Sequence, residues 1–99
     1  MRWAHSQNRW RRRAACVALI RGARKKQLFA EIVRTSDMLL GDDDEMVQKG
    51  LGWLLREAGK YDAKRTVPYL MKIRGRASRL VLRTACEKLS AAERKRVLG

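Results

Sequence analysis

The stretch Val47-Gln-Lys-Gly-Leu-Gly-Trp-Leu-Leu-Arg-Glu57 decides the fold, because it carries two helical sides of different character. Acidic residues 42–44 precede it and Gly59 follows it, which is the usual punctuation of a helix with an acidic N-cap and a glycine stop. Apolar residues recur at helical spacing on one side, so that side is predicted to face a core. The sequence therefore predicts a helix over residues 45–58, with a cationic stripe on its other side made of Lys49, Trp53, Arg56 and Lys60.

Two glycines, Gly50 and Gly52, lie inside this predicted helix. Each weakens a helix by about 1 kcal/mol relative to alanine. We expect them to permit a close approach of neighbouring backbones, which a larger side chain would prevent.

A seven-residue pattern within this helix, which we call the frame, occurs three times along the chain. A cation opens each copy, a small residue follows, Cys or Gly stands fourth and Leu stands seventh, in residues 13–19, 49–55 and 83–89. The offsets between copies are 36 and 34 residues, a period typical of stacked helical hairpins. Equivalent residues of such a stack line up on one face. We therefore expect a right-handed stack with Arg13, Lys49 and Arg83 on one face.

Capping residues and glycines place the remaining helices. Helices are predicted over residues 9–20, 25–40, 62–73, 78–89 and 90–98, with stops at Gly22 and Gly41 and a capping box at residues 90–93. Pro68 predicts a kink in the fourth helix or a later start at Thr66. The chain is thus predicted to be all-α, with about six helices in three antiparallel hairpins, over residues 8–41, 42–74 and 76–99.

The charge of the chain favours an anionic partner. Twenty-four Lys and Arg residues against ten acids give a formal net charge of +14 and a pI of about 11.1. Nucleic acid is the commonest partner that offsets such an imbalance, ahead of an anionic membrane surface or an acidic protein. We expect the cations equivalent in the three copies, and those on neighbouring turns, to merge into one phosphate-binding strip rather than to form three separate solvated faces. The candidates are Arg9, Arg13, Lys49, Arg56, Lys60, Arg79 and Arg83, with Trp53 as either a contact or a core residue.

Other classes of site find little support. Cys16 and Cys86 lack the C-x-x-C spacing of metal and redox sites, and His5 is the only histidine, so we expect buried cysteines, no metal and no cofactor. The longest apolar run, residues 14–20, is too short to cross a bilayer. No secretory signal is evident, so a cytoplasmic location is expected.

Three segments carry a family resemblance: Asn8-Arg-Trp-Arg-Arg-Arg-Ala-Ala15, Met46 through Glu57, and residues 82–89. Together they resemble the DNA alkylation repair glycosylases, whose domain is built of HEAT-like repeats. The resemblance implies a curved α-solenoid that binds duplex DNA in a cationic groove. It also implies excision of N3- or N7-alkylated purines without a metal and without a base-flipping pocket. By the same resemblance, Arg12 or Arg13 and Trp53 are contacts to the DNA backbone or the lesion.

One departure from that family concerns catalysis. The family's catalytic aspartate lies upstream of the W-x-R-R motif, and no acid precedes Trp10 in this chain. An oxocarbenium-like transition state requires a fixed carboxylate, so the chain is predicted to correspond to the C-terminal part of such an enzyme, lacking N-terminal repeats. The sequence identifies no catalytic residue, and it does not decide whether this chain by itself has glycosylase activity. A first hairpin without a preceding repeat exposes Trp3 and Trp10, so we expect self-association or poor solubility. The alternatives are a non-enzymatic nucleic-acid-binding module and a protein-binding helical scaffold.

Overall fold

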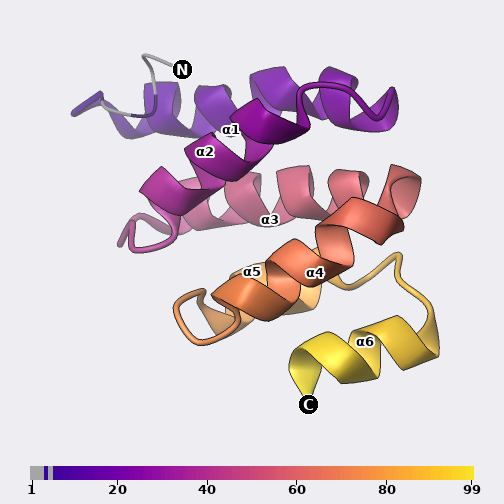
Figure 1. Ribbon diagram of the computed structural model, residues 1–99. Helices are drawn as coiled ribbons and strands as arrows, with labels where there is room; N and C mark the ends of the chain where they lie inside the picture. Colours follow the sequence, from indigo (N-terminus) through magenta and orange to yellow (C-terminus); the bar gives the residue numbers. More distant parts are fainter. Residues whose placement is uncertain (1–3, 5) are drawn as a thin grey trace.

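The computed structural model describes residue 4 and residues 6–99, so the expectation about Trp3 lies outside the described residues. Within this part of the chain the regular elements are six α-helices and there is no strand, which confirms the all-α prediction (Figure 1). The helices are α1 (Arg9–Arg24), α2 (Phe29–Leu39), α3 (Glu45–Tyr61), α4 (Ala63–Ile73), α5 (Arg79–Ala85) and α6 (Ala91–Leu98).

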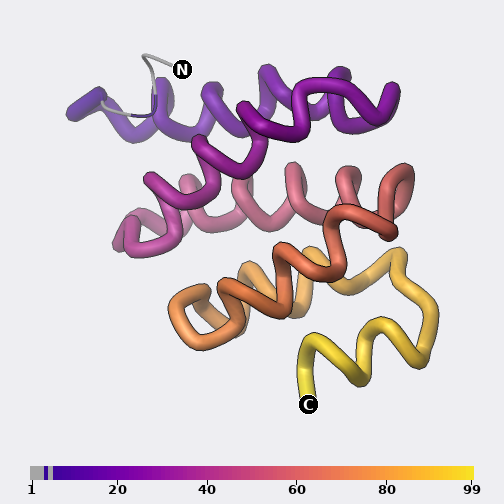
Figure 2. Tube along the Cα trace, viewed as in Figure 1, coloured from indigo at the N-terminus to yellow at the C-terminus, as the bar shows by residue number. Residues whose placement is uncertain are grey.

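The helices form two layers. α3 packs against α1 on one side and α5 on the other, so these three helices make up one layer. α2, α4 and α6 lie across them as the second layer, and each packs against the preceding helix of its hairpin (Figures 1 and 2). The chain descends through the stack hairpin by hairpin, from the N-terminal end to the C-terminal end (Figure 2). This arrangement is that of an α-solenoid, as the period of the frame predicts.

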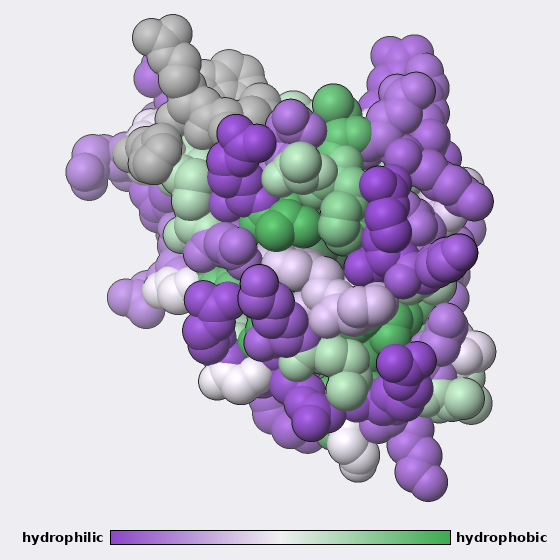
Figure 3. Space-filling view, in the orientation of Figure 1, coloured by the Kyte–Doolittle hydropathy of each residue, from purple (hydrophilic) through white to green (hydrophobic). Residues whose placement is uncertain are grey.

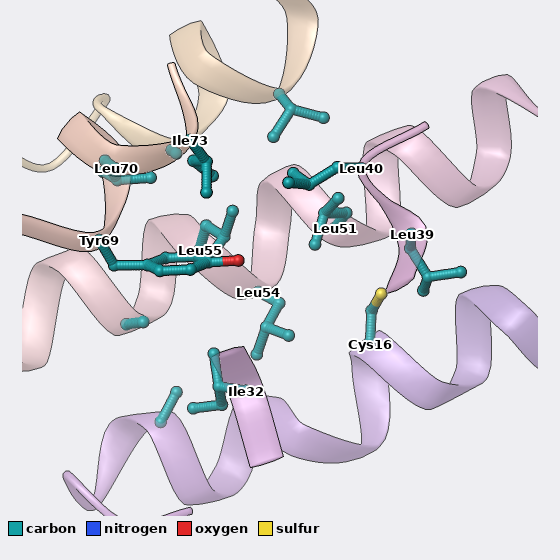
Figure 4. Packing of buried hydrophobic residues seen from close by; sticks show 14 of the residues in the cluster. Cys16, Ile32, Leu39, Leu40, Leu51, Leu54, Leu55, Tyr69, Leu70 and Ile73 are labelled. Carbon is teal, nitrogen blue, oxygen red and sulfur yellow. The ribbon is translucent and has the colours of Figure 1, made fainter. Parts of the chain in front are cut away.

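The hydrophobic core lies between the layers. α3 contributes Leu51, Leu54 and Leu55, which are fully buried against Ile32 of α2 and Leu70 of α4 among others (Figure 4). These are the apolar positions of the central stretch, so its predicted core side is confirmed.

Both cysteines are buried, as predicted. Burial raises the pKa of Cys16 to about 12, with a further contribution from the nearby charge of Asp42 that outweighs the opposing effect of Arg13. Burial also raises the pKa of Cys86. The thiols are therefore protonated at neutral pH and act as small core side chains.

Side-chain caps open α1, α3, α5 and α6, whereas Asp62, expected to cap α4, makes no side-chain cap hydrogen bond. Asp44 caps α3 by accepting hydrogen bonds from the backbone N–H of Met46 (2.9 Å) and Val47 (3.3 Å). Ser78 caps α5 in the same way. The box at residues 90–93 is complete, because the hydroxyl of Ser90 accepts from the Glu93 N–H and the Glu93 carboxylate accepts from the Ser90 N–H. Each cap satisfies N–H groups that have no partner within the helix.

A buried glutamine joins the layers. Gln48 donates its side-chain amide to the carbonyl of Leu39 at 3.1 Å, and its amide oxygen accepts from the hydroxyl of Ser78 at 2.9 Å. The end of α2, the first turn of α3 and the start of α5 are thereby held in one hydrogen-bond network. Such a satisfied buried network favours a single arrangement of these helices.

The predicted helix stops at Gly22 and Gly59 are wrong, because both glycines lie inside helices. α1 continues through Gly22 to Arg24, and α3 continues through Gly59 to Tyr61. The absence of a side chain permits close packing at both points instead. A Cβ on Gly22 would lie 2.6 Å from Cδ1 of Leu28, and one on Gly59 would lie 3.2 Å from Cδ2 of Leu89.

The other boundaries differ for local reasons. α2 begins at Phe29 rather than residue 25, because Lys26 and Leu28 have positive φ angles of 58° and 61°, which a helix excludes. α4 begins at Ala63, directly after Asp62, so the predicted later start at Thr66 is wrong. Pro68 lies inside this helix, and its ring is exposed to solvent. α5 ends at Ala85, before the predicted residue 89, in a tighter turn in which N–H groups bond to carbonyls three residues back.

Candidate nucleic-acid interface

The two glycines at the centre of α3 set its distance from both neighbours. A Cβ on Gly50 would lie 2.9 Å from Cγ of Arg13 in α1, and a Cβ on Gly52 would lie 3.0 Å from Cβ of Thr84 in α5. One glycine therefore faces each neighbouring helix, which confirms the predicted close approach. The three helices lie closer together than larger side chains at these two positions would permit.

The geometry of α3 then decides where its cations lie. At about 100° per residue, Lys49, Arg56 and Lys60 fall with Trp53 in a sector of about 60°. The buried residues Leu51, Leu54 and Leu55 are centred on the opposite side of the helix. The cationic stripe thus lies on the side of the α1–α3–α5 layer that is turned away from α2, α4 and α6. We call this side the basic face.

α5 extends the basic face. Because Thr84 points toward α3 and Ala85 is buried, Arg83 projects on the side opposite the core. Arg79, one turn earlier, lines a hollow with Arg74 of α4 and residues 97–99 at the end of α6, so it lies beside the other layer rather than on the stripe. Both arginines are exposed, as is Lys60, and none of the three forms an ion pair with a described residue. Their charges are therefore available to a ligand.

The arginines at the start of α1 occupy different places. Arg13 lies over Gly50, partly buried, and its buried Nε has no hydrogen-bond partner among the described residues. Arg12 is engaged internally, because its Nε lies 2.6 Å from Oδ2 of Asp42 and its Nη1 donates to the carbonyls of residues 6 and 7. Of the two arginines that the resemblance offers, Arg13 is therefore the one that lies beside the stripe of α3.

Arg9 is held at the edge of this surface, away from its centre. Its Nη1 lies 3.4 Å from Oδ2 of Asp44, the residue that caps α3. Burial opposes the charged form of Asp44, but the backbone N–H groups of Val47 and Met46 and the side chain of Arg9 outweigh it. The pKa of Asp44 is therefore lowered, so its carboxylate stays charged at neutral pH.

Trp53 is partly buried at the edge of the core. Its indole Nε1 is shielded from solvent and has no hydrogen-bond partner among residues 4 and 6–99. The ring thus packs against the core, and its role as a contact to a ligand stays a prediction.

Several cations of the basic face are paired with acids. Lys49 lies 3.3 Å from Oε1 of Glu45 one turn earlier, and both side chains are exposed. Arg56 Nη1 lies 3.2 Å from Oε1 of Glu87, which follows α5. Exposed pairs of this kind are weak and screened by salt, so a stronger anion such as a phosphate can replace the acid.

Sequence reasoning missed one arginine of this surface. Arg24 lies in the last turn of α1, and its Nε is 2.7 Å from Oε1 of Glu57 in α3. It escaped notice because the first helix was expected to end at Gly22. The signal that could have found it is Glu57 itself, an acid within the central stretch that requires a partner.

The described residues include no group of three or more His, Cys, Asp or Glu side chains placed to hold a metal ion. Nor does any described helix combine the length and apolar character needed to cross a membrane.

The side of the molecule formed by α2, α4 and α6 is also largely hydrophilic, with small apolar patches between the charged side chains (Figure 3). Polarity alone therefore does not single out the basic face. The basic face differs in carrying cations at the equivalent first position of the frame in three adjacent helices, Arg13, Lys49 and Arg83.

Comparison with known proteins agrees with the resemblance of the motifs. The model of a family described as DNA alkylation repair enzyme matches residues 1–89. No curated protein and no solved structure matches the chain. The family match takes in α1 through α5 and so the whole basic face. The chain therefore belongs to the DNA alkylation repair enzyme family.

Proposed function

We propose that this chain binds duplex DNA through the basic face and serves alkylation repair. The proposal is supported by the cations that stand at equivalent positions of the three copies of the frame, on three helices that pack side by side. The residues are Arg13 of α1, Lys49, Arg56 and Lys60 of α3, and Arg83 of α5, with Arg79 as a further candidate beside α6.

Rows of cations on rigid, closely packed helices suit the phosphates of a DNA backbone. Phosphate contacts supply affinity and orientation but read no sequence. Gly50 and Gly52 hold the three rows at a fixed separation, so less freedom is lost on binding. Trp53 lies within the central row, where its flat ring can contact a sugar or the edge of a base.

Excision is a separate question from binding. Positive charge develops on the sugar when an alkylated purine leaves, and a fixed carboxylate stabilises it. Three acids lie beside the stripe, and each is paired with a cation: Glu45 with Lys49, Glu87 with Arg56, and the buried Glu57 with Arg24. We therefore propose that residues 1–99 on their own bind DNA without efficient excision. A cytoplasmic location is also proposed, since a repair protein must reach DNA.

Salt dependence tests the binding proposal. A fluorescent duplex is titrated with protein at several salt concentrations between about 50 and 200 mM, and log K is plotted against log salt. We expect a steep line, and Lys49→Ala lowers its slope by about 1 because one phosphate contact is lost. Lys72→Ala, which removes an exposed lysine of α4 in the other layer, is the matched control and leaves the slope nearly unchanged. A flat line for the unaltered protein contradicts the proposal.

A further inference from the structure

A buried carboxylate joins two arginines that lie on neighbouring helices. The Nε of Arg24 in α1 is 2.7 Å from Oε1 of Glu57, and the Nε of Arg56 in α3 is 3.8 Å from Oε2 of the same residue. Arg56 also reaches Glu87 beyond α5 at 3.2 Å. The chain of charges therefore crosses the whole α1–α3–α5 layer.

The exposures of these side chains differ sharply. The side chain of Glu57 is only 6% exposed, whereas those of Arg24 and Arg56 are 50% and 31% exposed. The carboxylate is thus not a solvent-facing group, and it is shielded from direct contact with a large ligand. The Nε of Arg24 donates a hydrogen bond to the carboxylate, whereas the buried Nε of Arg56 lies near it without a hydrogen-bond partner among the described residues. A guanidinium has further donors on its Nη atoms. The Nη atoms of Arg24 have no hydrogen-bond partner among the described residues.

We propose that Glu57 is a positioning residue that holds Arg24 and Arg56 as a two-arginine clamp for a phosphate of the DNA backbone. This inference rests on the proposed function and adds Arg24 as a DNA contact. An arginine fixed by one carboxylate presents its remaining donors in a set direction, so phosphate binding loses less side-chain entropy. Planar guanidinium groups bind phosphate oxygens in pairs, which a lysine does not.

The rival explanation is that Glu57 only links α1 to α3. A buried ion pair by itself is weak evidence for a stabilising role. The two explanations predict opposite changes in DNA affinity when Glu57 is replaced by glutamine. Glu57→Gln raises the formal net charge from +14 to +15, so without a clamp DNA binding should strengthen. With the clamp it weakens, because a neutral amide holds the Nε of Arg24 less strongly than a carboxylate does and no longer attracts the charge of Arg56.

The experiment measures duplex affinity by fluorescence anisotropy at one salt concentration for Glu57→Gln, Arg24→Lys and the control Glu31→Gln. Glu31 lies on α2 in the other layer and forms no ion pair with a described residue, so its variant carries the same charge change away from the clamp. We expect affinity to fall roughly tenfold in Glu57→Gln and severalfold in Arg24→Lys, as for loss of a charge-assisted hydrogen bond. The control should bind as tightly as the unaltered protein or slightly more tightly.

Arg24→Lys protects the test against misfolding, because Arg24 is half-exposed and the variant keeps its charge. Circular dichroism shows whether each variant is helical. If Glu57→Gln is not folded, the duplex affinity of Arg24→Lys alone tests the clamp. The clamp is overturned if the folded variants bind as tightly as the unaltered protein. Failure of the unaltered protein to bind DNA in a salt-dependent way would instead reject the proposed function.

Discussion

Replacing Gly52 with alanine should destabilise the protein, although alanine favours helix formation. The new Cβ would lie 3.0 Å from Cβ and 3.2 Å from Cγ2 of Thr84. Rotation of the Thr84 side chain does not move its Cβ, so α5 itself must shift away from α3. Overpacking of this kind costs about 1–3 kcal/mol, while the gain in helix propensity is about 1 kcal/mol.

We therefore expect a net loss of about 1 kcal/mol in the free energy of unfolding, or about 4–8 °C in Tm for a domain of this size. Urea unfolding followed by circular dichroism measures it. Gly75→Ala is the control, because nothing lies within 4 Å of the added Cβ and the backbone φ is not positive. A Gly52→Ala protein at least as stable as the unaltered one would refute the packing argument. Its DNA affinity should also fall, since α5 carries part of the basic face.

Other predictions concern binding, chemistry and charge. Trp53→Ala should weaken duplex binding modestly, measured by anisotropy, and leave excision unchanged. Incubation with a duplex that contains N7-methylguanine should release little free base above the no-protein rate, because the carboxylates beside the basic face are paired with cations and the lack of a positioned catalytic group costs factors of about 10² to 10⁴. Robust multiple turnover would show that a carboxylate of this chain reaches the lesion. The Tm of Asp44→Asn should be lower than that of the unaltered protein at neutral pH. The lowered pKa of Asp44 adds stability above its ordinary value of 3.8, so the difference should vanish as pH falls through the native pKa. Trp10 is 55% exposed, so gel filtration should show concentration-dependent association that Trp10→Ser reduces.

Local chemistry made most of the fold predictable. Asp44, Ser78 and Ser90 open helices where their side chains predict, because a cap needs only the next few backbone N–H groups. The apolar spacing of the central stretch likewise identified its core side. Gly22 and Gly59 could not be interpreted in this way, because their roles depend on Leu28 and on a leucine of another hairpin. Glycine ends a helix or permits close packing according to residues that sequence does not place.

The candidate site was predictable only in part, for a similar reason. The stripe of α3 follows from helical spacing alone, and its neighbours on α1 and α5 follow from the repeat frame. Which cations are already paired is a property of the packed structure. The ion pairs of Arg12 with Asp42 and of Arg24 with Glu57 join residues that are 30 and 33 positions apart. No local pattern distinguishes such partners from free charges.

The measurement that tests the central claim most directly compares the two layers of the molecule. One double variant, Lys49→Ala with Arg83→Ala, removes two cations of the basic face; the other, Arg34→Ala with Lys72→Ala, removes two exposed cations of α2 and α4. Both carry the same net charge, so overall electrostatics affects them equally. We predict that the first lowers the salt slope of duplex binding by about 1.8, for two lost phosphate contacts, and that the second changes it little. Equal slopes for the two double variants would contradict the assignment of DNA binding to the basic face.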